Sequence, residues 1–173
     1  MHFGIDCAGT VTDTATLKAH GVEFVCRYVS PPGNAKNISH AEAARITHAG
    51  LELVLVWETN GDEPLQGTNQ GVQDARLAEA EAKAAGMPEG SPLYFAFDRD
   101  PSGLSAAEWT AIDGYYKGVA SVIGHQRTGA YGGYPFVKHL FDRKLITYGW
   151  QTYAWSGGLW DTRAQLRLSS SSS

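Results

Sequence analysis

The chain has 173 residues, of which 43% are hydrophobic and 18% are charged, with a formal net charge of -4 and a pI near 5.8. This length suits one domain with a hydrophobic core of its own, and the acidic balance excludes the basic surface of proteins that bind nucleic acids or anionic membranes. We therefore expect a monomer with no nucleic-acid or membrane partner, acting on a neutral polar substrate.

Apolar runs that indicate strands alternate along the chain with stretches that indicate helices. In three places a glycine that can cap a helix stands directly before an apolar run, at Gly21, Gly50 and Gly86. The strands are expected over residues 3–6, 22–28, 51–57, 93–97, 128–131, 147–152 and 164–168. Two helices are expected over 68–85 and 134–144, and a further helix before Gly21.

Two more helix starts carry the capping-box pattern, a serine followed three residues later by a glutamate. They are Ser39 with Glu42 and Ser105 with Glu108. In this motif each side chain satisfies a free backbone N–H of the first helical turn.

The alternation of strands and helices predicts an α/β protein with a parallel sheet and outer helices. Seven strands are one short of a complete (β/α)₈ barrel, which takes about 250 residues. The chain therefore forms a short TIM-type barrel with reduced helices, an incomplete barrel, or an open sheet. Residues 1–168 would make this domain, and the five serines at 169–173 would be a tail or the start of a linker.

We expect no secretion signal at the start of the chain, because the first strand is predicted to begin almost at Met1. No apolar run approaches membrane-spanning length. The chain is therefore expected to stay in the cytoplasm unless it is exported or released by another route.

Three apolar runs end on a carboxylate. They end at Asp6, Glu58 and Asp98, and Asp100 follows two residues after the last of these. Ligands of α/β folds bind outside the carboxyl ends of parallel strands. Four acids are therefore predicted to converge on one rim.

Asp98 and Asp100 lie two positions apart, which on a strand puts both side chains on one side, roughly 6.6 Å apart at the backbone. Carboxylates this close raise each other's pKa, so that one can stay protonated as a general acid while the other is ionised. The alternative is that Asp100 caps the turn formed with Pro101 and Ser102, and that Asp6 bonds its own loop.

Aromatic residues gather at the predicted strand ends, where they could stack on sugar rings. Each one alone could equally pack in the core. Arg27 and Tyr28 close the second strand, where Arg27 would either pair with Asp6, the interpretation we favour, or bind an acidic substituent. The predicted substrate-binding residues are Arg27, Tyr28, Trp57, Tyr131, Trp150, Gln151 and Trp155.

The remaining reactive residue types point to no further site. Cys7 and Cys26 follow neighbouring strands and could bridge, but buried thiols are expected in a chain with its own core. No two histidines have metal-ligand spacing beside an acid, so we expect no metal and no cofactor. The sequence also lacks a nucleophile elbow and a phosphate-binding glycine-rich loop.

Several strand-end motifs together resemble a known family. They lie at residues 3–6, 26–28, 55–58, 94–100, 129–132 and 148–155. The chain resembles the glycoside-hydrolase-like domains of bacterial and phage proteins, TIM-barrel relatives of the family-25 muramidases, which include the lysozymes of some phage endolysins. The resemblance implies that Asp6 and Asp98 match catalytic-site aspartates of the muramidases. Asp100 stands where those enzymes have the catalytic glutamate and is one methylene shorter.

The hypothesis with most support is a glycoside hydrolase acting on peptidoglycan or a related cell-wall glycan. Asp100 would be the general acid and Asp98 would stabilise the transition state, with Asp6 and Glu58 in support. If exported or released, the enzyme would act at the bacterial cell wall.

Two alternatives remain. One is a barrel that binds glycan without cleaving it, because Asp100 is short and the barrel is one strand short. The other is a magnesium-dependent phosphatase, because an apolar strand followed by Asp-x-Asp also opens the haloacid-dehalogenase fold. The sequence argues against it, because that motif usually lies near the start of the domain and the lysine and acidic pair that should follow are not found here.

Overall fold

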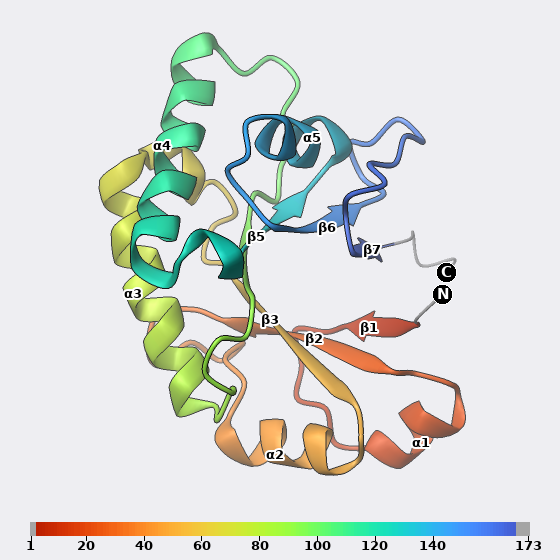
Figure 1. Ribbon diagram of the computed structural model, residues 1–173. Coiled ribbons are helices and arrows are strands. Elements are labelled where there is room, and N and C mark those ends of the chain that lie inside the picture. Colours follow the sequence, from red (N-terminus) through yellow and green to blue (C-terminus); the bar gives the residue numbers. More distant parts are fainter. Residues whose placement is uncertain (1–2, 169–173) are drawn as a thin grey trace.

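The computed structural model describes residues 3–168 and contains one seven-stranded parallel sheet (Figure 1). Each strand pairs with the next one in the chain, and the sheet curls into a nearly closed TIM-type barrel with helices outside. The strands are β1 (Gly4–Asp6), β2 (Phe24–Val29), β3 (Glu52–Trp57), β4 (Leu93–Ala96), β5 (Thr128–Gly132), β6 (Tyr148–Thr152) and β7 (Leu166–Leu168).

Five α-helices and two short 3₁₀ helices connect the strands. They are α1 (Thr14–Ala19), α2 (His40–His48), η1 (Glu63–Gln66), α3 (Thr68–Ala84), α4 (Ala106–Ile123), η2 (His125–Arg127) and α5 (Tyr134–Asp142). The long helices α3 and α4 pack side by side on one flank (Figure 1). The predicted fold class is therefore confirmed, and the open-sheet alternative is wrong. The serines at 169–173 lie outside the described residues.

The two faces of the barrel wall have separate cores, because neighbouring residues of a strand point to opposite faces. The inner core contains Cys26, Val56, Tyr94, Ala96, Tyr131 and Trp150. The outer core lies between the sheet and the helices and includes Leu55, Trp57, Phe95, Phe97 and Phe136. Every strand residue can thus be assigned to the barrel interior or to the helix layer.

The same alternation keeps the two cysteines apart. Cys26 belongs to the inner core, whereas Cys7 packs against the outer one. Both are free thiols, as the sequence predicted. Burial raises the pKa of both, which disfavours the reactive thiolate.

Only one of the two predicted capping boxes is complete. At α4, Ser105 accepts a hydrogen bond from the Glu108 N–H, and Glu108 accepts one from the Ser105 N–H. At α2, Ser39 accepts from the Glu42 N–H, but the carboxylate of Glu42 binds Arg27 instead of the cap. The ion pair between Glu42 and Arg27 therefore takes the place of the hydrogen bond that Glu42 would make to the Ser39 N–H in a complete capping box.

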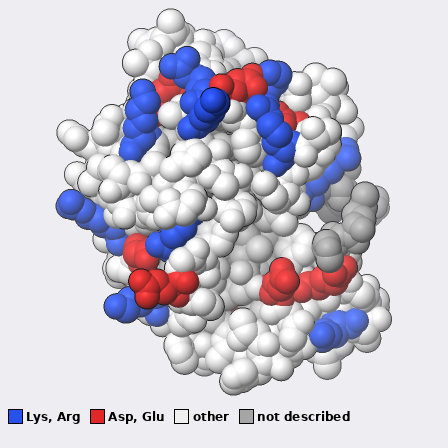
Figure 2. Space-filling model, viewed as in Figure 1, with Lys and Arg blue, Asp and Glu red and all other residues white. Residues whose placement is uncertain are grey.

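Charges of both signs are mixed on the surface. In the face shown in Figure 2, Lys and Arg side chains lie beside Asp and Glu side chains and form no continuous basic patch. None of the helices within residues 3–168 has the length and apolar character needed to span a membrane.

Candidate active site

Three of the four predicted acids lie at the carboxyl-end mouth of the barrel and face its interior. Asp6 ends β1 and pairs in register with Cys26 of the inner core. Glu58 and Asp98 each come two residues after an inner-core residue, Val56 and Ala96 respectively. The charge of Asp98 raises the pKa of both Asp6 and Glu58, so the three groups act on one another.

Asp6 is held by one hydrogen bond. The Tyr28 hydroxyl donates to Asp6 Oδ2 at 3.2 Å, while Oδ1 is buried with no hydrogen-bond partner. Burial raises the pKa of Asp6, and the charge of Asp98 adds to this rise. The Tyr28 hydrogen bond and the charges of Arg27 and Lys36 oppose it without cancelling it. The protonated form of Asp6 is therefore favoured more than in water.

Glu58 is also shielded, with its side chain only 13% exposed. Burial raises its pKa, the charge of Asp98 raises it further, and Lys36 lowers it in part. Lys36 Nζ lies 3.5 Å from Glu58 Oε1 and 5.4 Å from the centre of the Tyr28 ring. The sequence analysis missed Lys36, which lies in the loop after β2 and follows no strand pattern.

Asp98 is exposed and is positioned by the loop that follows β3. Its N–H donates to the Gly61 carbonyl at 2.9 Å. Gly61 has φ +81°, and a Cβ added there would lie 3.0 Å from Asp98 Cβ. Only glycine fits this position, on grounds of both backbone angle and space.

Asp100 lies outside this cluster. It is exposed, and its Oδ1 accepts a hydrogen bond from the Ser102 N–H at 2.8 Å. This bond lowers the pKa of Asp100. Asp100 is also not among the main causes of the raised pKa of Asp6 or Glu58. This is the turn-capping geometry that the alternative interpretation predicted.

Two of the predicted aromatics fill the barrel beneath the acids. Tyr131 and Trp150 pack edge to face with ring centres 4.8 Å apart, and Trp150 also contacts Tyr94. Tyr131 is 9% exposed and Trp150 3% exposed. Burial raises the pKa of the Tyr131 hydroxyl. These rings form the floor of the mouth.

Three predicted binding residues face the opposite side of the wall. Arg27 Nε lies 2.7 Å from Glu42 Oε1, so the expected ion pair with Asp6 is wrong. Trp57 is 1% exposed in the outer core. The side chain of Gln151 is buried beneath the loop that follows β6. Each is the strand neighbour of an inward-facing residue.

The last predicted binding residue, Trp155, lies on that same loop and is 36% exposed. It is the only one of the predicted aromatic binding residues that reaches solvent to this extent. Tyr28, by contrast, is half-buried beside Asp6.

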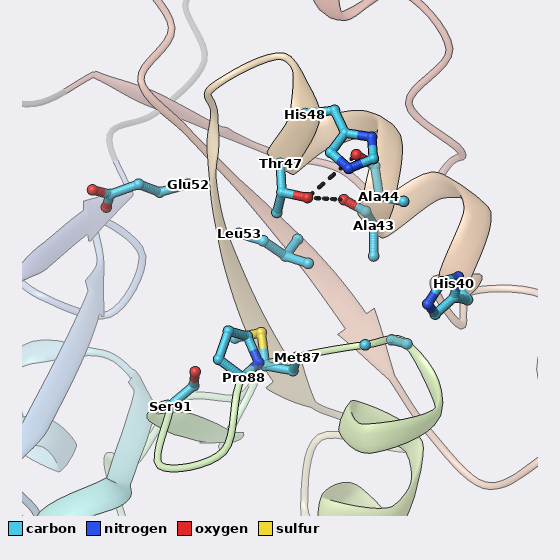
Figure 3. A pocket seen from close by; sticks show the side chains of 12 residues that line it. His40, Ala43, Ala44, Thr47, His48, Glu52, Leu53, Met87, Pro88 and Ser91 are labelled. Carbon is cyan, nitrogen blue, oxygen red and sulfur yellow. Dashed lines mark hydrogen bonds between the residues drawn. The ribbon is translucent and has the colours of Figure 1, made fainter.

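A pocket of about 530 Å³ lies elsewhere, between α2, the end of α3 and the segment before β4 (Figure 3). His40 and His48 reach it from α2, and Met87 and Pro88 line the facing side. None of the predicted acids lines this pocket. Within residues 3–168, no group of three or more His, Cys, Asp or Glu side chains is arranged to hold a metal ion.

The fold and the site define a parallel α/β barrel with a cluster of three carboxylates at its carboxyl-end mouth. Comparison with known proteins gives the family. The model of the Rv2525c-like, glycoside hydrolase-like domain matches residues 15–169, and the chain belongs to this family.

Relatives agree with this assignment. The chain is 33% identical over 156 residues to Rv2525c of Mycobacterium tuberculosis, a protein named as a candidate peptidoglycan hydrolase. The match covers 85% of this chain and 64% of that protein, so the chain spans less than two thirds of its relative's length.

Solved structures show the same fold. A crystal structure of the Tat-secreted Rv2525c with HEPES matches with a TM-score of 0.81 and 30% identity, over 94% of this chain and 84% of that one. The modular autolysin LytC of Streptococcus pneumoniae, solved with a synthetic peptidoglycan ligand, matches with a TM-score of 0.58 and 14% identity. This match covers 92% of this chain and 39% of LytC, and at this identity it speaks for the fold alone.

Proposed function

We propose that the chain is a glycoside hydrolase that acts on bacterial cell-wall glycan. The observation that carries the proposal is the convergence of Asp6, Glu58 and Asp98, two of which have a pKa raised by burial. Glycoside hydrolysis needs one protonated and one ionised carboxyl group at a single site. Membership of a glycoside hydrolase-like family and the name of Rv2525c support the same substrate class.

We assign the proton donor to Glu58. The sequence favoured Asp100, but its lowered pKa and its bond to Ser102 suit an ionised turn cap. Glu58 is shielded, has a raised pKa and carries a side chain one methylene longer than aspartate. It would transfer its proton to the glycosidic oxygen as the bond to the sugar carbon breaks, and water would then add to that carbon and give a proton back to Glu58.

Asp98 would be the ionised partner. Its exposed carboxylate faces the mouth, where a negative charge stabilises the positive charge that develops on the sugar ring. Asp6, whose second oxygen is buried, would support the site from below by accepting the hydrogen bond that positions the Tyr28 hydroxyl. The floor of Tyr131 and Trp150 excludes water from below the reacting groups.

Export is part of the proposal, because the substrate lies outside the cytoplasm. The relative Rv2525c is described as Tat-secreted. We propose that this chain also reaches the cell wall, by whichever route its host supplies.

The direct test is incubation of purified peptidoglycan with the protein, followed by mass spectrometry of the released fragments. The unchanged protein should produce new reducing ends. Glu58→Gln and Asp98→Asn should lose this activity, whereas Asp100→Asn should keep it. If the unchanged protein releases no fragments, the proposed function is wrong. If the Asp100 variant alone is inactive, the assignment of the donor is wrong.

A glycan-binding barrel without turnover is the second candidate. One observation favours it: the position after β4 that corresponds to the muramidase glutamate holds a turn-capping aspartate with a lowered pKa. Saturable binding to peptidoglycan without new reducing ends would support this candidate over the hydrolase.

A further inference from the structure

The loop between β6 and β7 displays large apolar side chains to solvent. Tyr153, Trp155 and Leu159 are 54%, 36% and 57% exposed. Only two other large apolar residues within residues 3–168, Phe3 and Leu77, are exposed. Most of the exposed large apolar side chains of the described chain are therefore concentrated on one loop, as at binding surfaces.

Trp155 also has an unfavourable backbone conformation. Its φ is +55°, and among the described non-glycine residues only Lys144 shares a positive φ, at the same value. A side chain with a Cβ, and a bulky one above all, is disfavoured in this region. Such strain persists only where the surroundings impose it, and it is concentrated at functional sites.

Two buried polar side chains impose the shape of the loop. Gln151, 1% exposed, donates to the Leu159 carbonyl at 2.8 Å and to Ser156 Oγ at 3.2 Å, and accepts from the Asp161 N–H at 2.9 Å. Ser156, 4% exposed, donates to the Thr152 carbonyl at 2.6 Å and accepts from the Tyr134 N–H at 2.9 Å. The loop is thus tied to β6, to its own far end and to the start of α5.

Gly133 completes the support from the side of α5. A Cβ added to Gly133 would lie 3.0 Å from Trp155 Cβ. The backbone before α5 therefore packs directly against Trp155, and no larger residue would leave room for the loop in this position.

The loop begins at the edge of the candidate active site. Thr152 ends β6, two residues after Trp150, whose ring packs against Tyr131. Burial raises the pKa of Tyr131, and the charges of Asp98, Asp6 and Glu58 raise it further. Tyr153 is the next residue along the chain. A ligand that extends beyond the carboxylates on this side would therefore meet the loop first.

We propose that Tyr153 and Trp155 form a preorganised stacking platform for a sugar ring of the glycan, one that is bound next to the cleaved linkage. The proposal rests on the proposed function. Sugar rings present C–H faces that pack on aromatic planes. A loop that is already ordered loses less conformational entropy when it binds a ligand. The strained backbone of Trp155 would hold its ring in the binding position before the glycan arrives. Gln151 and Ser156 are positioning residues that act through the loop.

The first test is co-sedimentation of the protein with insoluble peptidoglycan, scored separately from the release of reducing ends. Trp155→Ala should weaken binding roughly fivefold, and Trp155→Phe should retain most of it, because the loss is that of one stacking contact. Phe3→Ala is the control, since it removes an exposed aromatic ring that lies just before β1 and not on the loop. Binding of Trp155→Ala that equals that of the unchanged protein would overturn the platform.

The strain has its own matched control in Lys144, which lies between α5 and β6 with the same φ. At both positions the Gly variant should melt roughly 3 °C above the Ala variant, because only glycine accepts this conformation without cost. Glycan binding should fall at position 155 and stay unchanged at position 144. Equal melting of the Gly and Ala variants at 155 would show that no strain is stored there and would refute the preorganisation.

Gln151→Ala tests the positioning role. It should raise KM for soluble glycan fragments with little change in kcat, because the loop contacts a neighbouring sugar ring and none of the reacting atoms. A fall in kcat with KM unchanged would contradict the assignment. If the unchanged protein binds peptidoglycan through Trp155 but does not cleave it, the platform stands and only the proposed hydrolysis fails.

Discussion

Two glutamates on either side of the β2–β3 region are both shielded from water, yet their environments differ in kind. Burial would raise the pKa of Glu42, but hydrogen bonds from Arg27 and from the Val11 N–H, with the charges of Arg27 and Arg45, lower it below its usual value. Glu58 has only Lys36 to offset its burial and the nearby Asp98, and its pKa is raised.

The contrast distinguishes a glutamate that stabilises the fold, Glu42, from one that is available for catalysis, Glu58. Both carboxylate oxygens of Glu42 accept hydrogen bonds, from Arg27 Nε at 2.7 Å, Arg27 Nη2 at 3.1 Å and the Val11 N–H at 2.7 Å. Such a saturated ion pair holds the outer wall together. Glu58 has spare capacity to bind a proton or a ligand, which is what a site requires.

The largest expected effect is on stability, through the outer pair. Arg27→Met should leave Glu42 as an unpaired buried charge and lower the free energy of unfolding by about 3–5 kcal/mol. Denaturant unfolding measures this loss. Glu42→Gln added to Arg27→Met should recover part of it, since no charge is then buried alone. An additive double variant would mean that the two residues do not act as a pair.

Glu58→Gln should have the largest effect on activity, a loss of roughly 10²-fold or more in peptidoglycan cleavage, as expected for a general acid. The same change should stabilise the fold at neutral pH. A raised carboxyl pKa means that the folded state holds its proton more tightly than the unfolded state, so stability falls as pH rises from the usual value near 4 through the raised value. The stability gain should therefore disappear in acid, which thermal melts at several pH values can check.

Lys36→Met should shift the pH profile of cleavage rather than abolish it. Lys36 lowers the pKa of Glu58, so its removal should raise that pKa further. Because the donor must be protonated, the alkaline limb of kcat should move to higher pH. Lys36→Arg retains the charge and serves as the control. A limb that does not move would exclude Glu58 as the group that titrates there.

Asp100→Asn should have the smallest effect. The side chain is exposed, and asparagine can still accept from the Ser102 N–H. Cleavage rates and the melting temperature should stay close to those of the unchanged protein. A large loss of cleavage here, with Glu58→Gln still active, would reverse the assignment of roles.

Much of the fold could be predicted from the sequence, because apolar runs and glycine caps mark the strands directly. The direction of each side chain follows from alternation, but strand-end position alone treats neighbours alike. Arg27 and Tyr28 stand side by side in β2, yet one enters the helix layer and the other faces Asp6. Counting alternate residues back from Glu58 would have placed Trp57 on the opposite face, but none of the three acids follows β2 to give the same guide there.

Other features of the site depend on contacts that no local pattern encodes. Asp100 lies beyond the end of β4, in a turn where the strand period no longer holds. Lys36 reaches Glu58 from an irregular loop. The positive φ of Trp155 is held by the loop around it, which is fixed by the hydrogen bonds of Gln151 and Ser156. Those bonds reach Leu159, Asp161 and Tyr134. These contacts join residues that are far apart in the sequence or lie in irregular segments, so only the folded structure reveals them.

The gap in the barrel has a consequence for solubility. Within residues 3–168 the strand order runs from β1 to β7 without a pairing between these two, so each presents an unpaired edge. An unpaired edge is where strands of other molecules add and aggregates begin. Both edge strands have only three residues, fewer than any other strand in the sheet. Lengthening either one with further β-forming residues should promote aggregation between molecules.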